Sequence, residues 1–298
     1  MRRGDWEGAW QINDELLCRS DGSALDVTQP RHLQAIWDGR SLRNRRVLVR
    51  CYHGLGDTVQ FIRFIKPLRK IARQVAVWMQ PKLLPLLERT EGIDLALPLH
   101  DGAPDIDYDV DIEIMELPYA LRTTLDTLPA AVPYIYVSDD QAPPREGAFT
   151  AGLVWQAGGW DPNRSVDPGL MRRLTQRSGV SWQVLQRGPA LRHWQRGCGT
   201  IPPISDVVQE AVRLRSLDLL ITVDTLSAHL AGALGVPTWL LLPAQADWRW
   251  MEHRCDTPWY PSMRLFRQAH VGDWETVINT VATAVDRVSQ RRAEDVTR

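Results

Sequence analysis

Residues 217–235 read LDLLITVDTLSAHLAGALG, a pattern that decides the fold class of this chain. The apolar run 217–223 has the length and composition of a buried strand. Asp224 and Thr225 end that run, and residues 226–234 carry apolar side chains at helical spacing. A strand that passes directly into a helix is the repeating unit of parallel α/β sheets, so this stretch predicts such a sheet.

The same alternation of strands and helices extends outward on both sides. In the second half we expect strands at 152–155, 182–185, 238–242 and 264–266, and helices near 168–177, 206–215 and 274–288. In the first half we expect a short helix over 5–20, strands at 46–52, 75–79 and 93–99, an amphipathic helix that opens at Asp57, and another helix over 81–88. The chain is therefore predicted to fold as two doubly wound parallel sheets.

A polar segment that contains prolines, residues 138–148, separates these two halves and is the predicted linker. The predicted organisation is a helical N-terminal extension (1–44), a first Rossmann-like domain (45–140), a second one (149–272) and a C-terminal helix (273–290). Ligands of doubly wound sheets bind outside the carboxyl ends of the strands. We therefore expect a ligand cleft between the two domains.

Composition excludes several classes of protein. The 298 residues include 35 Lys and Arg against 36 Asp and Glu, a net charge of −1, whereas nucleic-acid-binding proteins are usually strongly basic. No apolar stretch approaches the roughly 18 to 20 residues of a spanning helix, and the N-terminus has no apolar signal core. The four cysteines form no Cys-x-x-Cys pair, which favours neither a zinc site nor a disulfide framework. We expect a soluble cytoplasmic protein without a bound metal.

Residues 105–114 alternate strictly between acidic and apolar side chains. A period of two predicts a strand with one acidic face and one apolar face. That acidic face is either a cation site or the solvated side of an edge strand, and the second interpretation is favoured because alternation does not make ligands converge.

Three polar motifs follow predicted strands. In the first, residues 53–58 (HGLGDT), the two glycines allow close backbone approach to a ligand, and Asp57 is either a helix cap or a catalytic carboxylate. In the second, residues 224–229 (DTLSAH), a helix N-terminus offers N–H groups to a pyrophosphate; the alternative is simple capping with a packed His229. The third, residues 156–165 (QAGGWDPNRS), carries Arg164, which is either a phosphate clamp or a solvent-exposed loop residue.

Together these motifs make the chain resemble a known family. The matching stretches are 54–63 (GLGDTVQFIR), 223–235, 239–243 (WLLLP), 247–250 (DWRW) and 259–268 (WYPSMRLFRQ). The chain resembles bacterial glycosyltransferase family nine, whose best-known members are the ADP-heptose:lipopolysaccharide heptosyltransferases. It is most similar to the branch that follows tetratricopeptide repeats, and residues 4–17 are similar to the last helix of such a repeat.

The resemblance implies a GT-B fold, with the acceptor mainly on the first domain and a nucleotide-sugar donor mainly on the second. It implies an inverting, metal-independent transfer that needs no cofactor besides the donor. The last helix is expected to cross back onto the first domain. The implied site residues are the general base Asp57; the donor-binding residues Gly54, Gly56, Gln156, Arg164, Ser165, Gln186, Asp224, Thr225 and His229; and the acceptor or cleft residues His53, Asp247 and Trp248.

Two departures from the family pattern argue against adenine as the base of the donor and against heptose as its sugar. Heptosyltransferases usually have glycine where this chain has Leu226, and an acidic residue near the nucleotide where this chain has Gln186 and Arg187. The acceptor stays open among a glycan, a lipid-linked sugar and a protein side chain, and peripheral contact with a membrane is compatible with each. Two other functions are kept as alternatives: a non-catalytic nucleotide-sugar-binding or scaffold protein, and a sugar-nucleotide epimerase.

Overall fold

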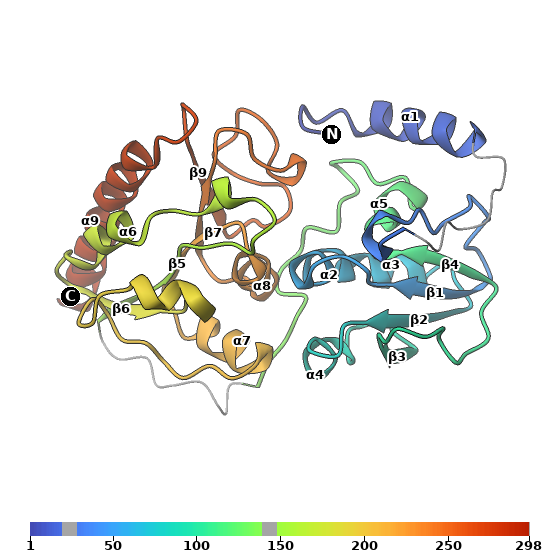
Figure 1. Cartoon of the computed structure of the whole chain (residues 1–298), viewed down its shortest axis with the longest axis horizontal. Coiled ribbons are helices and arrows are strands. Elements are labelled where there is room, and N and C mark those ends of the chain that lie inside the picture. Colours follow the sequence, from blue (N-terminus) through green and yellow to red (C-terminus); the bar gives the residue numbers. More distant parts are fainter. Residues whose placement is uncertain (20–28, 139–147, 298) are drawn as a thin grey trace. The chain divides into compact units, whose positions relative to one another are not determined.

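The computed structural model describes residues 1–19, 29–138 and 148–297, and the chain divides into two compact units, Met1–Ile135 and Tyr136–Arg298. Each unit contains one fully parallel sheet (Figure 1). The predicted α/β class with two parallel sheets is thereby confirmed. The linker predicted over 138–148 lies almost wholly outside the described residues.

The first unit is built on a four-stranded sheet in the order β3-β2-β1-β4. Its strands are β1 Arg46–Arg50, β2 Gln74–Met79, β3 Leu95–Pro98 and β4 Val110–Glu113. Its helices are α1 Trp6–Arg19, α2 Leu55–Phe61, α3 Ile65–Arg69, α4 Leu84–Leu87 and α5 Leu117–Ala120. The central strands β1 and β2 are apolar on both faces because helices and loops cover both, as parallel sheets require.

Two helices of this unit differ from their sequence predictions. The helix expected to open at Asp57 begins at Leu55, and a 3-10 turn, Ile62–Phe64, divides it into α2 and α3. The helix expected over 81–88 keeps only α4, Leu84–Leu87. Pro67 and Pro85, neither of which has a backbone N–H, lie inside these segments, and proline limits how far a helix can extend toward its N-terminus.

The acidic strand expected over 105–114 is shorter than predicted, since β4 covers only 110–113, and it lies at the edge of the sheet. Two carboxylates of this stretch, Asp109 just before β4 and Asp111 within it, pair with arginines of the neighbouring strand β1. Arg46 Nη2 lies 3.0 Å from Asp109 Oδ1, and Arg50 Nη2 lies 2.6 Å from Asp111 Oδ2. The alternating charges therefore pair across two strands, which supports the edge-strand interpretation and removes these carboxylates from a cation site.

The helix α1 packs on the first unit through its two tryptophans. Trp10 is 5.6 Å from the ring of Tyr119 and donates from Nε1 to the carbonyl of Thr123 at 2.7 Å. Asp14 on the same helix accepts from the hydroxyl of Tyr119 and pairs with Arg122. This helix is therefore an integral layer of the first unit.

The second unit has a five-stranded sheet in the order β6-β5-β7-β8-β9. Its strands are β5 Phe149–Val154, β6 Val180–Val184, β7 Leu219–Val223, β8 Thr238–Leu242 and β9 Met263–Arg267. Its helices are α6 Pro168–Thr175, α7 Val207–Arg215, α8 Leu226–Leu234 and α9 Trp274–Thr297. The strand β7 and the helix α8 are the two elements predicted from residues 217–235, and they follow each other with only Asp224 and Thr225 between them.

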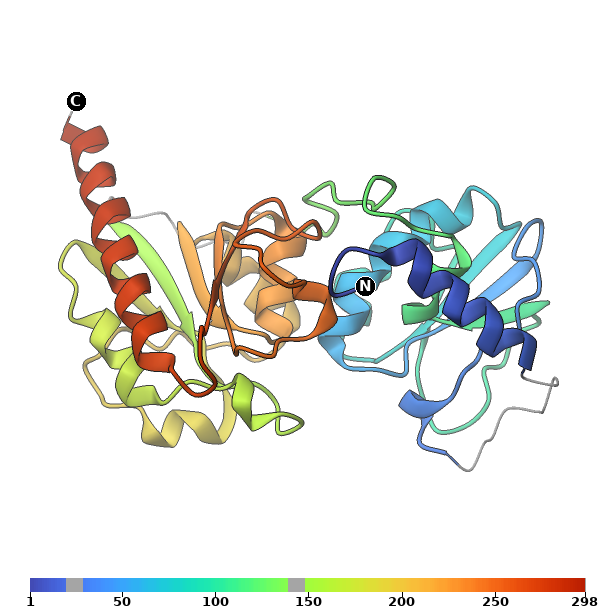
Figure 2. The ribbon, with the colours of Figure 1, turned by 90° about the horizontal axis from the view of Figure 1, so that it is seen from above.

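The C-terminal helix α9 lies beside α6 on one face of the second sheet (Figure 2). Its apolar residues Val277, Ile278, Val281 and Val285 are buried in the same core cluster as residues of β5, β7 and α6. These four side chains therefore belong to the core of the second unit. The expected crossing of this helix back onto the first domain stays a prediction. Within the described ranges, no helix is both long and apolar enough to span a membrane.

Candidate functional site

The turn after β1 presents the first predicted motif at the carboxyl edge of the first sheet. Gly54 is the N-cap of α2, and its backbone N–H donates to Oδ2 of Asp57 at 3.0 Å. A Cβ atom at Gly54 would lie 3.1 Å from that oxygen, so a larger residue here would press on the Asp57 carboxylate. The expectation that Asp57 itself is the N-cap is therefore wrong, because Gly54 takes that place and Asp57 is the third residue of the helix. Its carboxylate caps the Gly54 N–H, and this bond fixes its direction beside Gly56 in the first helical turn.

His53 precedes this turn and is held by a residue that received no individual role from the sequence. Its Nδ1 lies 3.0 Å from Oε1 of Glu113, which ends β4 and is only 1% exposed. The Glu113 carboxylate also accepts the N–H groups of Tyr52 at 3.2 Å and Met115 at 2.6 Å. Because β1 and β4 are neighbours, their ends bring this buried carboxylate to His53.

A second connection fixes the same turn from β2. The amide of Gln80 donates to the carbonyl of His53 at 2.8 Å and accepts from the hydroxyl of Thr58 at 3.0 Å. Gln80 follows the end of β2, so three strand ends determine the position of the His53–Asp57 turn. This edge presents a rigid, partly acidic surface.

In the second unit, Asp224 and Thr225 stand between β7 and the N-terminus of α8. Thr225 is the N-cap residue, but its side chain makes no capping hydrogen bond, and its hydroxyl instead donates to the carbonyl of Val223 at 3.3 Å. The first N–H groups of a helix have no partner within the helix. The first N–H groups of α8 therefore receive no capping bond from the Thr225 side chain, and an anion site at this helix start stays a prediction.

Asp224 is nearly buried and is held by a histidine one turn into α8. His229 Nε2 lies 3.5 Å from Asp224 Oδ1, and its Nδ1 lies 3.0 Å from the hydroxyl of Tyr260. The imidazole stacks on Trp250 with 5.5 Å between ring centres. Burial acts to raise the pKa of Asp224, but the hydrogen bond from His229 and the neighbouring charges outweigh it, so the pKa lies below its usual value. His229 is thus the packed histidine of the alternative interpretation, and it supports Asp224.

Arg164 reaches the same place from the loop after β5. Its Nη1 donates to the carbonyl of Asp224 at 3.3 Å and lies 3.6 Å from Asp224 Oδ2, and the side chain is 19% exposed. The guanidinium also lies 5.6 Å from the ring centre of the exposed Trp160. Arg164 is therefore not a loose surface residue: its guanidinium lies against Asp224, the residue before the N-cap of α8.

Two further predicted donor residues, Ser165 and Gln186, hold the loop in place through their side chains. The hydroxyl of Ser165 accepts from the N–H of Ala157 at 3.2 Å. Gln186 Oε1 accepts from the N–H groups of Trp155 at 3.0 Å and Gln156 at 2.8 Å. Ser165 and Gln186 thus shape the loop that carries Arg164, a supporting role that residue type alone does not reveal.

Asp247 and Trp248 lie in the segment after β8. Asp247 caps a 3-10 turn, Trp248–Trp250, by accepting from the N–H of Arg249 at 3.0 Å, and it pairs with the Arg249 guanidinium at 2.8 Å. Trp248 packs edge-on against Trp259, with 6.0 Å between ring centres. Both contacts are local to this segment, so the predicted acceptor role of these two residues stays a prediction.

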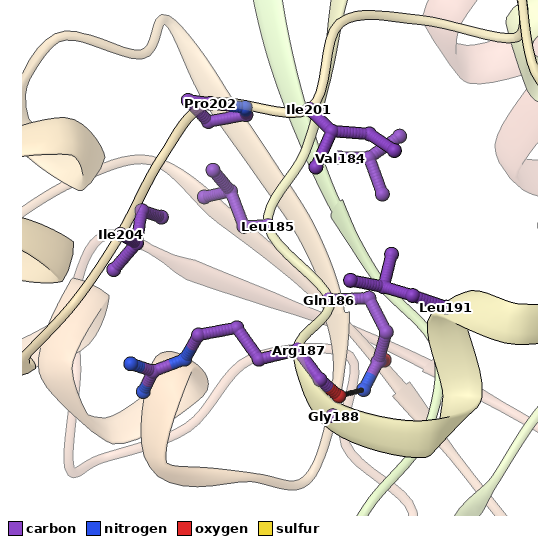
Figure 3. A pocket seen from close by; sticks show the side chains of 9 residues that line it. All are labelled: Val184, Leu185, Gln186, Arg187, Gly188, Leu191, Ile201, Pro202 and Ile204. Atoms are coloured by element: carbon purple, nitrogen blue, oxygen red, sulfur yellow. Dashed lines mark hydrogen bonds between the residues drawn. The ribbon is translucent and has the colours of Figure 1, made fainter.

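A pocket of about 240 Å³ opens at the carboxyl end of β6 (Figure 3). It is lined by Val184, Leu185, Gln186, Arg187, Gly188, Leu191, Ile201, Pro202 and Ile204. Arg187 Nη2 donates to Glu210, a side chain only 1% exposed, and Glu210 Oε1 accepts from the hydroxyl of Ser227 at 2.5 Å. Burial raises the pKa of Glu210, although the Arg187 charge opposes this. Since Ser227 lies in the first turn of α8, this chain of bonds links the pocket to the anion site.

Among the described residues, no group of three or more His, Cys, Asp or Glu side chains is arranged to hold a metal ion.

The predicted site residues lie in two groups. The carboxyl edge of the second sheet carries Gln156, Arg164, Ser165, Gln186, Asp224, Thr225 and His229, and the carboxyl edge of the first carries His53, Gly54, Gly56 and Asp57.

No family model matches the chain. Protein FlbA of Caulobacter vibrioides is 25% identical over 293 residues, which cover 84% of this chain and 48% of FlbA, so the chain spans about half the length of this curated relative.

Solved structures resemble the chain over most of its length. A glycosyl transferase family 9 protein from Veillonella parvula aligns with a TM-score of 0.62 and 14% identity, over 85% of this chain and 99% of that one. E. coli heptosyltransferase WaaC, solved with ADP-2-deoxy-2-fluoro heptose, aligns with a TM-score of 0.58 and 12% identity, over 81% of this chain and 99% of that one. E. coli ADP-heptose lps heptosyltransferase II aligns with a TM-score of 0.61 and 12% identity, over 83% of this chain and 99% of that one. The chain therefore has the two-sheet GT-B fold of the family 9 heptosyltransferases.

Proposed function

We propose that this chain is a glycosyltransferase that moves a sugar from a nucleotide-sugar donor to an acceptor hydroxyl with inversion of the anomeric centre. One observation carries the proposal: on a GT-B fold, Arg164 and the uncapped N-terminus of α8 meet at Asp224. A cation and a helix N-terminus at one point suit a diphosphate. The GT-B fold of the solved heptosyltransferases supports the same assignment.

The second unit supplies leaving-group stabilisation. As the bond between the anomeric carbon and the diphosphate oxygen breaks, negative charge builds on that oxygen. The fork of Arg164 and the N–H groups at the start of α8 are already in place to stabilise that charge. In this proposal they do the work for which other transferases use a metal ion, and the nucleotide sugar is a substrate rather than a resident cofactor.

The first unit supplies the base. Asp57 takes the proton of the acceptor hydroxyl while that oxygen attacks the anomeric carbon and the diphosphate leaves from the opposite face. The hydrogen bond from Gly54 holds one carboxylate oxygen, which sets the direction of the other. His53, held by the buried Glu113, borders the same turn and is assigned to the acceptor side.

Two finer assignments belong to the same proposal. The position of the chain in the repeat-associated branch rests on the resemblance of residues 4–17 to a repeat helix, and the relative FlbA is about twice as long as the matching region. The acceptor is a glycan, a lipid-linked sugar or a protein side chain, and the reaction is placed in the cytoplasm, with peripheral membrane contact compatible with each acceptor.

Product analysis tests this function against its two alternatives. The chain is incubated with a panel of nucleotide sugars, with and without cell-extract fractions as acceptor, and released nucleotide is measured by chromatography. Nucleotide release that depends on the acceptor and is lost in Asp57→Asn supports transfer. Conversion of the donor without an acceptor identifies an epimerase. Binding of the donor without any consumption identifies a non-catalytic binding protein, and either of these two outcomes overturns the proposal.

A further inference from the structure

The pocket beside β6 has an unusual division of polar and apolar side chains. Of its lining residues only Gln186 and Arg187 have polar side chains. Figure 3 shows Arg187 extended along one side of the pocket, with Leu185, Pro202 and Ile204 across from it. A flat, largely apolar ring with a polar edge suits such a lining.

The Gln186 amide is committed to the protein. Its oxygen accepts the two backbone N–H groups of Trp155 and Gln156, and its nitrogen donates to the carbonyl of Arg187 at 3.1 Å. Turning this amide to serve a ligand would leave two backbone N–H groups without their acceptor, a costly change in a buried place. Arg187 is therefore the side chain that sets the polarity of the pocket.

Arg187 offers hydrogen-bond donors and no acceptor, because a guanidinium carries five N–H groups and stays charged. The buried carboxylate of Glu210 anchors one of its terminal nitrogens, and the Ser227 hydroxyl holds Glu210 from the other side. Among the described residues, Glu210 is the side chain with which Arg187 pairs. The guanidinium is thus fixed at one end, and its side chain is 40% exposed.

We propose that this pocket takes the nucleobase of the donor and selects a base that carries a ring carbonyl, namely guanine, uracil, thymine or cytosine, over adenine. This inference rests on the proposed function, because it assigns the donor of the same site. Arg187 donates to the carbonyl oxygen of the base, while Leu185, Leu191 and Ile204 contact the ring. The bonds through Glu210 to Ser227 place the base next to the diphosphate at α8.

Adenine lacks a ring carbonyl and presents an exocyclic amine, which is a donor. A ring nitrogen of adenine can accept one Arg187 N–H, but the neighbouring amine would face another Arg187 donor, so the contact would hold fewer hydrogen bonds than a contact with a carbonyl base. A well-matched pair of hydrogen bonds to a base discriminates by roughly five- to 150-fold against the wrong base. The expected preference is therefore at least tenfold in dissociation constant for a carbonyl base over adenine.

Titration calorimetry of the full chain with ADP, GDP, UDP, dTDP and CDP tests this preference. At least one carbonyl-base nucleotide should bind ten times more tightly than ADP. Arg187→Met keeps the apolar stem and removes the donors. It should therefore weaken the binding of that nucleotide tenfold or more and leave the dissociation constant of ADP within about threefold of the wild-type value. Arg192→Met, an exposed arginine of the neighbouring 3-10 turn, is the matched control and should change neither.

Removing Arg187 alone leaves the buried Glu210 without its cation, so the double variant Arg187→Met/Glu210→Gln is measured beside it, with thermal unfolding as a check on folding.

ADP binding as tightly as the best carbonyl-base nucleotide overturns the inference. So does a base preference that survives in a folded Arg187 variant. If no nucleotide binds, the inference and the proposed function fail together. If nucleotides bind without base preference but lose affinity in Arg164→Ala, only the inference fails.

Discussion

The Nδ1 atom of His229 lies 3.0 Å from the hydroxyl of Tyr260, and the same imidazole stacks on Trp250. Both aromatic residues are fully buried. This packing holds the Nε2 atom of His229 toward Asp224, which in turn bonds to Arg164. The orientation of Arg164, the arginine proposed to bind the donor diphosphate, therefore depends on aromatic packing behind the first turn of α8.

Gly232→Ala tests that dependence. A Cβ atom at Gly232 would lie 2.4 Å from Cδ1 of Tyr260, so the ring must shift, and its contact with His229 shifts with it. We expect a loss of about 1–3 kcal/mol in the free energy of unfolding, as for other overpacked cores, together with weaker nucleotide binding. Chemical denaturation and calorimetry measure the two effects. Gly159→Ala is the control, because no atom lies within 4 Å of its Cβ position. Wild-type stability and affinity in Gly232→Ala would contradict this account of the ring cluster.

Asp57→Asn separates chemistry from binding. The amide oxygen of asparagine still accepts from the N–H of Gly54, so the turn should keep its shape. Loss of a general base typically costs on the order of a hundredfold or more in turnover. Donor affinity should be nearly unchanged, because the Asn variant keeps the turn at Gly54 and Gly56 and because the proposed diphosphate site at Arg164 and α8 lies in the second unit. Acceptor-dependent turnover and calorimetry of the same variant give both values. Normal turnover would show that Asp57 is only a helix cap.

Glu116 predicts a pH dependence of stability. Burial raises its pKa from an ordinary 4.5 to about 7, against the opposing hydrogen bonds from the N–H groups of Glu113, Trp37 and Ile36. The folded state therefore holds this proton more tightly than the unfolded chain does. The contribution of this proton to the free energy of unfolding is complete below about pH 4.5 and is lost as the pH rises through about 7.

Glu116→Gln removes this titration. The difference in unfolding free energy between wild type and variant should change by on the order of 2–3 kcal/mol between pH 5 and pH 8, with the wild type losing stability relative to the variant as the pH rises. Denaturation at several pH values measures the difference. A difference that stays constant with pH would show that Glu116 titrates normally.

Much of the second unit could be predicted from the sequence because its signals are local. The helix expected over 226–234 is α8, Leu226–Leu234, and the strand expected over 238–242 is β8, Thr238–Leu242. An apolar run bounded by polar residues is enough to define such elements. The turn motif at Asp57 and the loop with Arg164 were located in the same way.

The contacts between these elements could not be predicted, because they depend on which strands are neighbours. Arg164 and Asp224 are 60 residues apart and meet only because β5 pairs with β7. The alternation over 105–114 showed an acidic face, but pairing of β4 with β1 decides that Asp109 and Asp111 meet arginines and that Glu113 is buried beside His53. Glu210 gave no signal at all, since a glutamate within an amphipathic helix is normally exposed.

Binding of nucleoside diphosphates and their sugar conjugates to wild type and Arg164→Ala tests the central claim most directly. Charged hydrogen bonds to a ligand contribute about 1.5–3 kcal/mol. At least one nucleotide should therefore bind the wild type and lose tenfold or more in affinity in Arg164→Ala. Arg173→Ala, an exposed arginine paired with Glu275, should bind as the wild type does. Equal binding by wild type and a folded Arg164→Ala variant, or no binding of any nucleotide, would contradict a donor site at Arg164 and α8.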